Sequence, residues 1–164
     1  MRKRAFCLVA LALASGASVA EITLRHALTG EALDLTVAKD FKQPSPAVQQ
    51  FLNTGQNPYN CDTKKIEEGH NLFLTACSGC HGHEAEGKLG PALKDDYWTY
   101  PAGASDKGLF EILFGGASGQ MGPQYLSLTM DDMLKVMAYL RSIYQGDPRK
   151  AKWQACATSE GDKR

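Results

Sequence analysis

The sequence of this 164-residue chain predicts a mainly α-helical fold. Three segments carry apolar residues at helical spacing, and each follows a side chain that can cap a helix: Asp62, Ser105 and Thr129. Glycine or proline ends the last two of these segments, as at Gly115-Gly116. We therefore expect short helices joined by loops.

Residues 1–20 are predicted to be a secretory signal peptide. Basic residues at 2–4 precede the apolar run 5–14, and the small residues at 18–20 suit cleavage. The apolar run is too short for a membrane-spanning helix. Cys7 lies inside this leader and should be absent from the mature protein. The leader predicts export to the periplasm.

The charge balance argues against a nucleic-acid-binding protein. The 18 Lys and Arg, less the three in the leader, leave 15 against 18 Asp and Glu, so the mature chain is mildly acidic. No basic patch is visible. No other segment is apolar enough to cross a bilayer. We expect a soluble protein with no nucleic-acid partner and no membrane anchor.

Residues 21–60 are expected to form an N-terminal extension packed on the core. Apolar residues alternate on both sides of residues 29–31, which fits a short hairpin or two extended segments. Pro46 can start a brief helix that includes Phe51. Residues 53–60 are rich in turn formers and predict a loop.

The predicted core domain spans residues 61–145. Its first helix places Ile66 and Phe73 at helical spacing, and its second does the same with Leu109 and Leu113. The first helix leads directly into the motif that carries the chemistry of the chain.

The last predicted helix covers residues 130–144. It follows Thr129, and Asp132 resembles the second member of a capping box. Its apolar residues are those of a buried helix face: Met133, Val136, Met137, Leu140, Ile143 and Tyr144. Gly146 and Pro148 end the helix, and residues 146–164 are assigned to a C-terminal tail.

Cys77-Ser78-Gly79-Cys80-His81 is the signature of covalently attached c-type haem. Two thiols separated by two residues can each form a thioether to one porphyrin vinyl group, and His81 can then offer Nε2 to the iron. A redox dithiol or half a zinc site needs only the two cysteines and leaves His81 unexplained. The motif predicts one haem c held through Cys77 and Cys80.

Met121 is the predicted ligand on the other face of the iron. It lies in a glycine-containing loop forty residues after His81, and a loop can bring a thioether over the ring without unwinding a helix. Met130, Met133 and Met137 lie on the last predicted helix, where core packing explains them. An iron with ligands on both faces carries electrons, whereas an open face binds gas or activates peroxide.

The remaining histidines are weaker candidates for that position. His83 lies too near His81 to reach the opposite face, and a solvated helix surface is the default for His70. Nothing around His26 indicates a ligand.

Pro91 is expected to support the haem site. Small cytochromes c often place a proline carbonyl here, where it accepts a hydrogen bond from the proximal histidine and fixes its ring. A plain turn is the alternative, because Gly-Pro marks turns in any protein. Tyr97 and Trp98 are expected to wall the haem crevice, with Trp98 reaching toward a propionate.

Longer runs of the chain resemble the cytochrome cL family. The resemblance is carried by residues 77–91 (CSGCHGHEAEGKLGP), 95–101 (DDYWTYP), 108–117 (GLFEILFGGA) and 119–124 (GQMGPQ). It implies a monohaem class I cytochrome c fold with an N-terminal extension. It also implies that Cys77 and Cys80 attach the haem, and that His81 and Met121 are its axial ligands.

Cytochrome cL is the periplasmic electron acceptor of methanol dehydrogenases that use pyrroloquinoline quinone (PQQ). The resemblance implies that this chain takes single electrons from such an enzyme, of the calcium or the lanthanide type, and passes them to a downstream cytochrome c or oxidase. A generic soluble cytochrome c that serves another dehydrogenase is the first alternative. A haem enzyme or sensor with an open iron is the second, and Met121 argues against it.

Acidic residues near the haem motif are candidates for steering toward a basic patch on the dehydrogenase: Glu84, Glu86, Asp95 and Asp96. A solvated acidic rim is the alternative for each of them. A calcium site is left open, because no ligand spacing specifies one.

We predict a disulfide between Cys61 and Cys156, which are the cysteines left over in an oxidising compartment. Two buried free thiols are the alternative. In the chain-entropy model such a bond stabilises the fold by roughly 4 to 5 kcal/mol, less any strain. The intact mass should rise on reduction by the hydrogens added to one disulfide, and an unchanged mass would contradict the bond.

Overall fold

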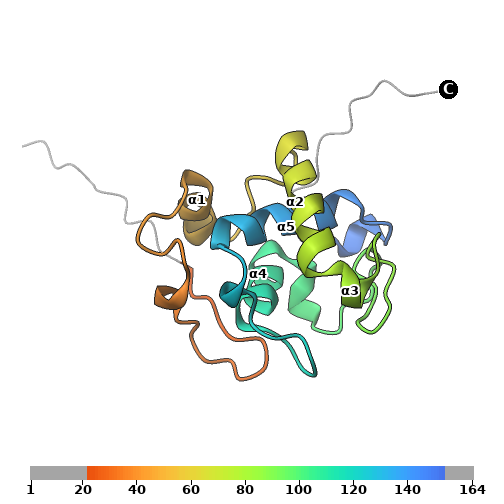
Figure 1. Cartoon of the computed structure of the whole chain (residues 1–164), viewed down its shortest axis with the longest axis horizontal. Helices are drawn as coiled ribbons and strands as arrows, with labels where there is room; N and C mark the ends of the chain where they lie inside the picture. The colour runs from red at the N-terminus through yellow and green to blue at the C-terminus, as the bar shows by residue number, and fades with distance from the viewer. Residues whose placement is uncertain (1–21, 154–164) are drawn as a thin grey trace, which may run out of the picture.

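The computed structural model describes residues 22–153, and within this range it is helical, as predicted (Figure 1). The α-helices are α1 (Pro46–Thr54), α2 (Thr63–Ala76), α3 (Ser78–His81), α4 (Asp106–Gly115) and α5 (Met130–Ser142). The 3₁₀ helices are η1 (Leu35–Val37), η2 (Pro101–Ala104), η3 (Gln124–Leu126) and η4 (Pro148–Lys150). The described part of the chain pairs extended backbone only as isolated bridges.

The helix starts follow local signals in the sequence. Asp62 accepts a hydrogen bond from the Lys65 amide at the start of α2, and Thr129 and Asp132 form the complete capping box of α5. Helix α5 ends at Ser142, slightly before the predicted limit. Helix α3 is a single turn without apolar periodicity, so the sequence did not predict it as a separate helix.

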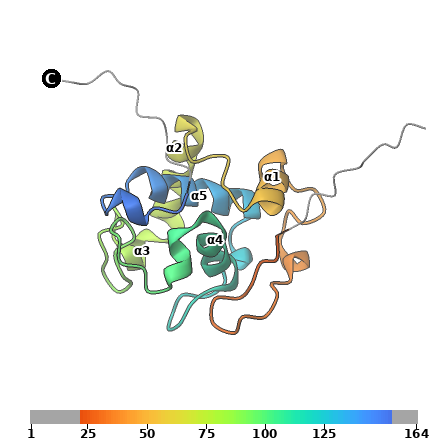
Figure 2. The ribbon, with the colours of Figure 1, turned by 180° about the vertical axis from the view of Figure 1, so that it is seen from behind.

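The crossing of α2 over α5 forms the centre of the fold (Figures 1 and 2). Phe73 of α2 is fully buried and lies 5.2 Å from the ring of Tyr139 on α5. At Gly69 a Cβ atom would lie 2.0 Å from the Lys135 carbonyl oxygen. The two backbones therefore approach more closely than any residue with a side chain would allow.

A chain of aromatic rings links the extension to the loop after α4. Phe51 of α1 lies 4.7 Å from Phe110 of α4, and Phe110 lies 5.6 Å from Phe114. Phe114 in turn lies 5.3 Å from Tyr125 in η3. Fully burying one such side chain stabilises the fold by about 1.5 to 3 kcal/mol. These rings join α1, α4 and η3 into one core.

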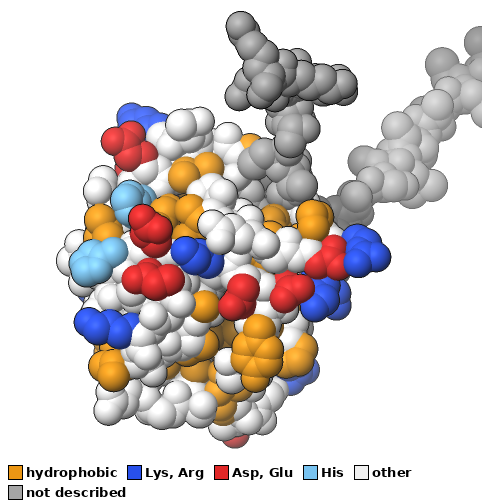
Figure 3. Space-filling view, turned by 90° about the vertical axis from the view of Figure 1, so that its right-hand side faces the viewer, with side chains coloured by type: hydrophobic (Ala, Val, Ile, Leu, Met, Phe, Trp, Pro, Cys, Tyr) orange, Lys and Arg blue, Asp and Glu red, His pale blue; other side chains and the backbone are white. Residues whose placement is uncertain are grey.

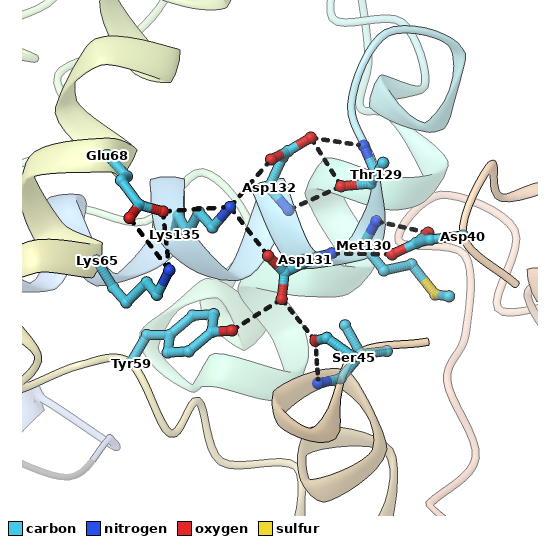
Figure 4. A network of polar contacts seen from close by, with 11 residues as sticks. Asp40, Ser45, Tyr59, Lys65, Glu68, Thr129, Met130, Asp131, Asp132 and Lys135 are labelled. Carbon is cyan, nitrogen blue, oxygen red and sulfur yellow. Dashed lines mark hydrogen bonds and ion pairs between the residues drawn. The ribbon is translucent and has the colours of Figure 1, made fainter. Parts of the chain in front are cut away.

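Polar contacts from residues 40–59 hold the N-terminal end of α5 (Figure 4). The Asp40 carboxylate accepts hydrogen bonds from the Met130 amide at 3.0 Å and the Asp131 amide at 3.2 Å. Asp131 accepts from the hydroxyls of Ser45 at 2.5 Å and Tyr59 at 2.8 Å. The extension thus caps the helix from outside and binds its first turn.

The first part of the extension is a minimal hairpin. Arg25 and Ala32 form an antiparallel bridge, and the His26 amide donates to the Glu31 carbonyl at 2.8 Å. Gly30 takes the turn with a positive φ of 72°. Figure 2 shows α1 and this extension at one end of α5 and α3 at the other.

The predicted signal peptide and Cys156 lie outside the described residues, so the leader and the disulfide with Cys61 stay predictions. Among residues 22–153 no helix combines the length and the apolar character needed to cross a bilayer.

Replacing Gly69 with alanine should destabilise the fold by about 2 to 3 kcal/mol, because the new methyl group meets the backbone of Lys135 and not a side chain that can move. Urea unfolding followed by circular dichroism measures this loss. Asn71→Ala is the matched control, since Asn71 is exposed on the same helix and its change should cost less than about 0.5 kcal/mol. Equal midpoints for the two variants would rule out the close contact at Gly69.

Candidate haem site

The end of α2 and the single turn of α3 deliver the Cys77–His81 motif to the surface of a crevice. The Cys77 amide donates to the Phe73 carbonyl at 2.8 Å, which continues α2 by one residue, and the His81 amide donates to the Cys77 carbonyl at 3.0 Å. Cys77 is buried and Cys80 is exposed, and both are free thiols. Residues three apart on one helical turn share a face, so both sulfurs lie within reach of one ligand.

His81 is oriented by a backbone acceptor. Its side chain is 8% exposed, and its Nδ1 lies 2.8 Å from the Pro91 carbonyl oxygen. With the Nδ1 proton donated to that carbonyl, the lone pair of Nε2 is left for a metal ion. This is the arrangement expected of a histidine ligand with a supporting acceptor.

Gly90 is a functional residue that the sequence analysis missed. A Cβ atom at this position would lie 2.6 Å from Cε1 of His81, and the Gly90 amide donates to the Cys80 carbonyl at 2.8 Å. A side chain would push the imidazole away from Pro91. The sequence assigns support of the haem site to Pro91, and the structure adds that position 90 has no space for a side chain beside His81.

His81 and Met121 line the same two adjoining cavities. One, with about 760 Å³ of empty volume, is walled by apolar residues that include Leu109 and Leu113. The other, of about 1000 Å³, passes Cys77, Cys80 and Leu89. Pro91 and Ser118 line both. Together they make one crevice that brings the thiols, the imidazole and the thioether to a common space.

Met121 is carried by a tight loop after α4. Gly116 has a φ of 83°, and its Cβ position would lie 2.8 Å from the Met121 carbonyl oxygen, so a side chain is excluded there. Met130, Met133 and Met137 are buried in the core, and neither cavity is lined by any of them. The position of Met121 is thus the one that suits a ligand facing His81.

Trp98 lines the apolar cavity and carries an unpaired donor. Its indole Nε1 is buried and has no hydrogen-bond partner among the described residues. The ring is held by Arg141, whose guanidinium lies 5.2 Å from it and pairs with Asp106 at 3.0 Å. A carboxylate entering the cavity would satisfy the indole N–H, so the residues fit a haem with its propionates. Tyr97 lines the same cavity but is 71% exposed, which places it at the mouth.

The other histidines lie away from this crevice. His70 stacks on Tyr139 at 4.6 Å, His83 is exposed, and His26 packs against Gly115. No cluster of three or more His, Cys, Asp or Glu side chains within residues 22–153 could hold a metal ion.

The chemistry of Cys77 argues against a redox dithiol. Burial, with a smaller contribution from the Cys80 thiol, raises the pKa of Cys77 to about 11. Disulfide oxidoreductases work through a thiolate whose pKa is lowered. The Cys77 thiol is therefore poorly suited to thiol exchange.

This chain is similar to known cytochromes in its sequence. Residues 64–140 match the family model described as cytochrome c oxidase, cbb3-type, subunit III. Cytochrome c-L of Methylorubrum extorquens is 50% identical over 132 residues, which are 80% of this chain and 67% of that protein.

Two crystal structures of cytochrome cL share the fold. The protein from the marine methylotroph Methylophaga aminisulfidivorans has a TM-score of 0.79 at 55% identity, over 82% of this chain and 89% of its own. The protein from Hyphomicrobium denitrificans has a TM-score of 0.76 at 46% identity, over 83% and 82%. The chain belongs to the cytochrome cL family of c-type cytochromes, which are electron-transfer proteins and not enzymes.

Proposed function

We propose that this protein accepts single electrons in the periplasm from a PQQ-dependent methanol dehydrogenase and passes them to a downstream cytochrome c or oxidase. The observation that carries the proposal is the pairing of His81, bonded to Pro91, with Met121 across one apolar crevice that also contains Cys77 and Cys80. The relatives that carry the name cytochrome cL support the choice of donor.

The residues of the crevice have distinct roles in this proposal. Cys77 and Cys80 would hold the haem through thioethers, and His81 and Met121 would ligate its iron. When bound, the haem supplies a one-electron iron couple. The Met121 thioether favours ferrous iron and so raises the reduction potential, while the Pro91 carbonyl fixes His81 and makes it a stronger donor.

The protein moves electrons without moving protons or atoms. Oxidation of one methanol leaves two electrons on the quinone, so two oxidised cytochromes must each take one. With both His81 and Met121 as ligands, the iron would have no open position for a substrate. The chain itself supplies binding, orientation and exclusion of water from the crevice.

The face around the crevice mouth is the proposed docking surface for the dehydrogenase. Figure 3 shows acidic side chains in a band across this side of the molecule, with Lys and Arg side chains among them and apolar side chains gathered below. Glu84, Glu86 and Asp95 are exposed here, whereas Asp96 pairs with Lys150 at 2.8 Å. Leu89, 80% exposed, lines the wider cavity. The acidic groups suit steering toward a basic patch, and the apolar groups suit close contact.

Stopped-flow reduction tests the proposal. The oxidised holoprotein is mixed with methanol dehydrogenase turning over methanol, and the haem α-band is followed. Rapid reduction that slows as salt is added is the expected result, since steering by charge is screened. A Met-ligated haem that is reduced by dithionite but not by the enzyme would leave a generic electron carrier with another donor.

Charge reversal tests the docking face. The pair Glu84→Lys and Asp95→Lys should slow reduction at least about fivefold at low salt, because steered association depends on charge complementarity. The difference from wild type should shrink at high salt.

The matched control is Glu31→Lys with Glu67→Lys, an equal change of net charge at exposed positions on the hairpin and on α2. If both pairs slow the reaction equally, net charge and not this face is responsible.

A further inference from the structure

The loop that carries Met121, residues 117–122, is lightly held. It is closed internally by a hydrogen bond from the Ala117 amide to the Met121 carbonyl at 2.8 Å. The Cβ positions at Gly119 and Gly122 meet no atom within 4 Å, so the loop faces open space at these points. Its position must therefore depend on a few specific contacts.

Both hydrogen bonds from this loop to a distant segment go to Tyr100. The Tyr100 hydroxyl donates to Ser118 Oγ at 2.9 Å and accepts from the Ser118 amide at 2.9 Å. Across residues 22–153, no further hydrogen bond joins residues 117–122 to a segment outside 116–124.

Tyr100 is itself well anchored. Its carbonyl accepts from the Gly103 amide at 2.8 Å, at the start of η2. That 3₁₀ helix packs directly on α4, since a Cβ atom at Gly108 would lie 2.0 Å from the Ala102 carbonyl oxygen. Tyr100 and Ser118 line the apolar cavity together with Met121. The side chain of Tyr100 therefore lies at the wall of the crevice, and the loop is hydrogen-bonded to its hydroxyl.

We propose that Tyr100 is a positioning residue: through Ser118 it holds residues 117–122 in the place that keeps the Met121 sulfur over the haem iron. The inference rests on the proposed function, because it requires Met121 as an axial ligand. A thioether favours ferrous iron, so the ferric protein relies most on the loop to retain this ligand.

Imidazole binding to the ferric holoprotein tests the inference. Imidazole takes the place of Met121, and its apparent affinity rises with the fraction of molecules whose loop is open. Tyr100→Phe removes both hydrogen bonds and should tighten imidazole binding about three- to tenfold. Ser118→Ala keeps the backbone donor and should have a smaller effect in the same direction.

The double variant Tyr100→Phe with Ser118→Ala separates the loss of the Tyr100–Ser118 hydrogen bonds from other effects of the two substitutions. Ser118→Ala should add nothing in the Tyr100→Phe background, since the contact is already lost. Tyr125→Phe is the control, because Tyr125 packs on Phe114 and lines neither cavity of the crevice. Additive effects, or a Tyr100→Phe affinity equal to that of Tyr125→Phe, would overturn the inference.

The far-red charge-transfer band of ferric Met ligation keeps this test distinct from the proposed function. A wild-type protein without the band would show that Met121 does not ligate the iron, and the proposed function would fail first. A band present in wild type with unchanged imidazole affinity in the variants would reject only the role of Tyr100. If Tyr100→Phe does not fold, Ser118→Ala measured against Tyr125→Phe decides the matter.

Discussion

The close approach of α2 to α5 at Gly69 is the constraint on which the rest of the structure depends. This contact fixes the position of α2 along α5 and so the place where α2 ends. The haem motif begins with the next residue. Phe73, one turn further along α2, packs its ring against that of Tyr139. Because the amide of Cys77 bonds to the carbonyl of Phe73, the packing of the core is transmitted directly to the attachment point.

The two sides of the crevice are built differently. On the His81 side the ligand belongs to a helical turn, and its imidazole is bonded to Pro91 and enclosed by Gly90. On the opposite side Met121 belongs to a loop whose support comes from Gly116 and Tyr100. In the proposed haem site, the rigid His81 would fix the haem, and the less constrained Met121 would determine how readily the iron opens to another ligand.

The helices, and the residues that the structure brings together at the crevice, could be predicted from the sequence because their signals are local. A cap three residues from its acceptor, as at Asp62, and a haem motif of five residues can be recognised without knowledge of the fold. Gly69, Gly90 and the Tyr100–Ser118 contact could not. Each of these residues matters because of the atoms that the fold brings next to it. A single glycine or tyrosine in the sequence gives no pattern that identifies those neighbouring atoms.

The burial of Cys77 has a consequence for the order of events during biogenesis. Thioether formation requires a sulfur that is accessible and reactive, whereas in the fold the Cys77 thiol is buried and that burial raises its pKa. A chain that folded fully before receiving its cofactor would present Cys77 only through the crevice that it lines. In the proposed haem site, the thioether at Cys77 therefore forms more readily before α2 packs on α5 than after it.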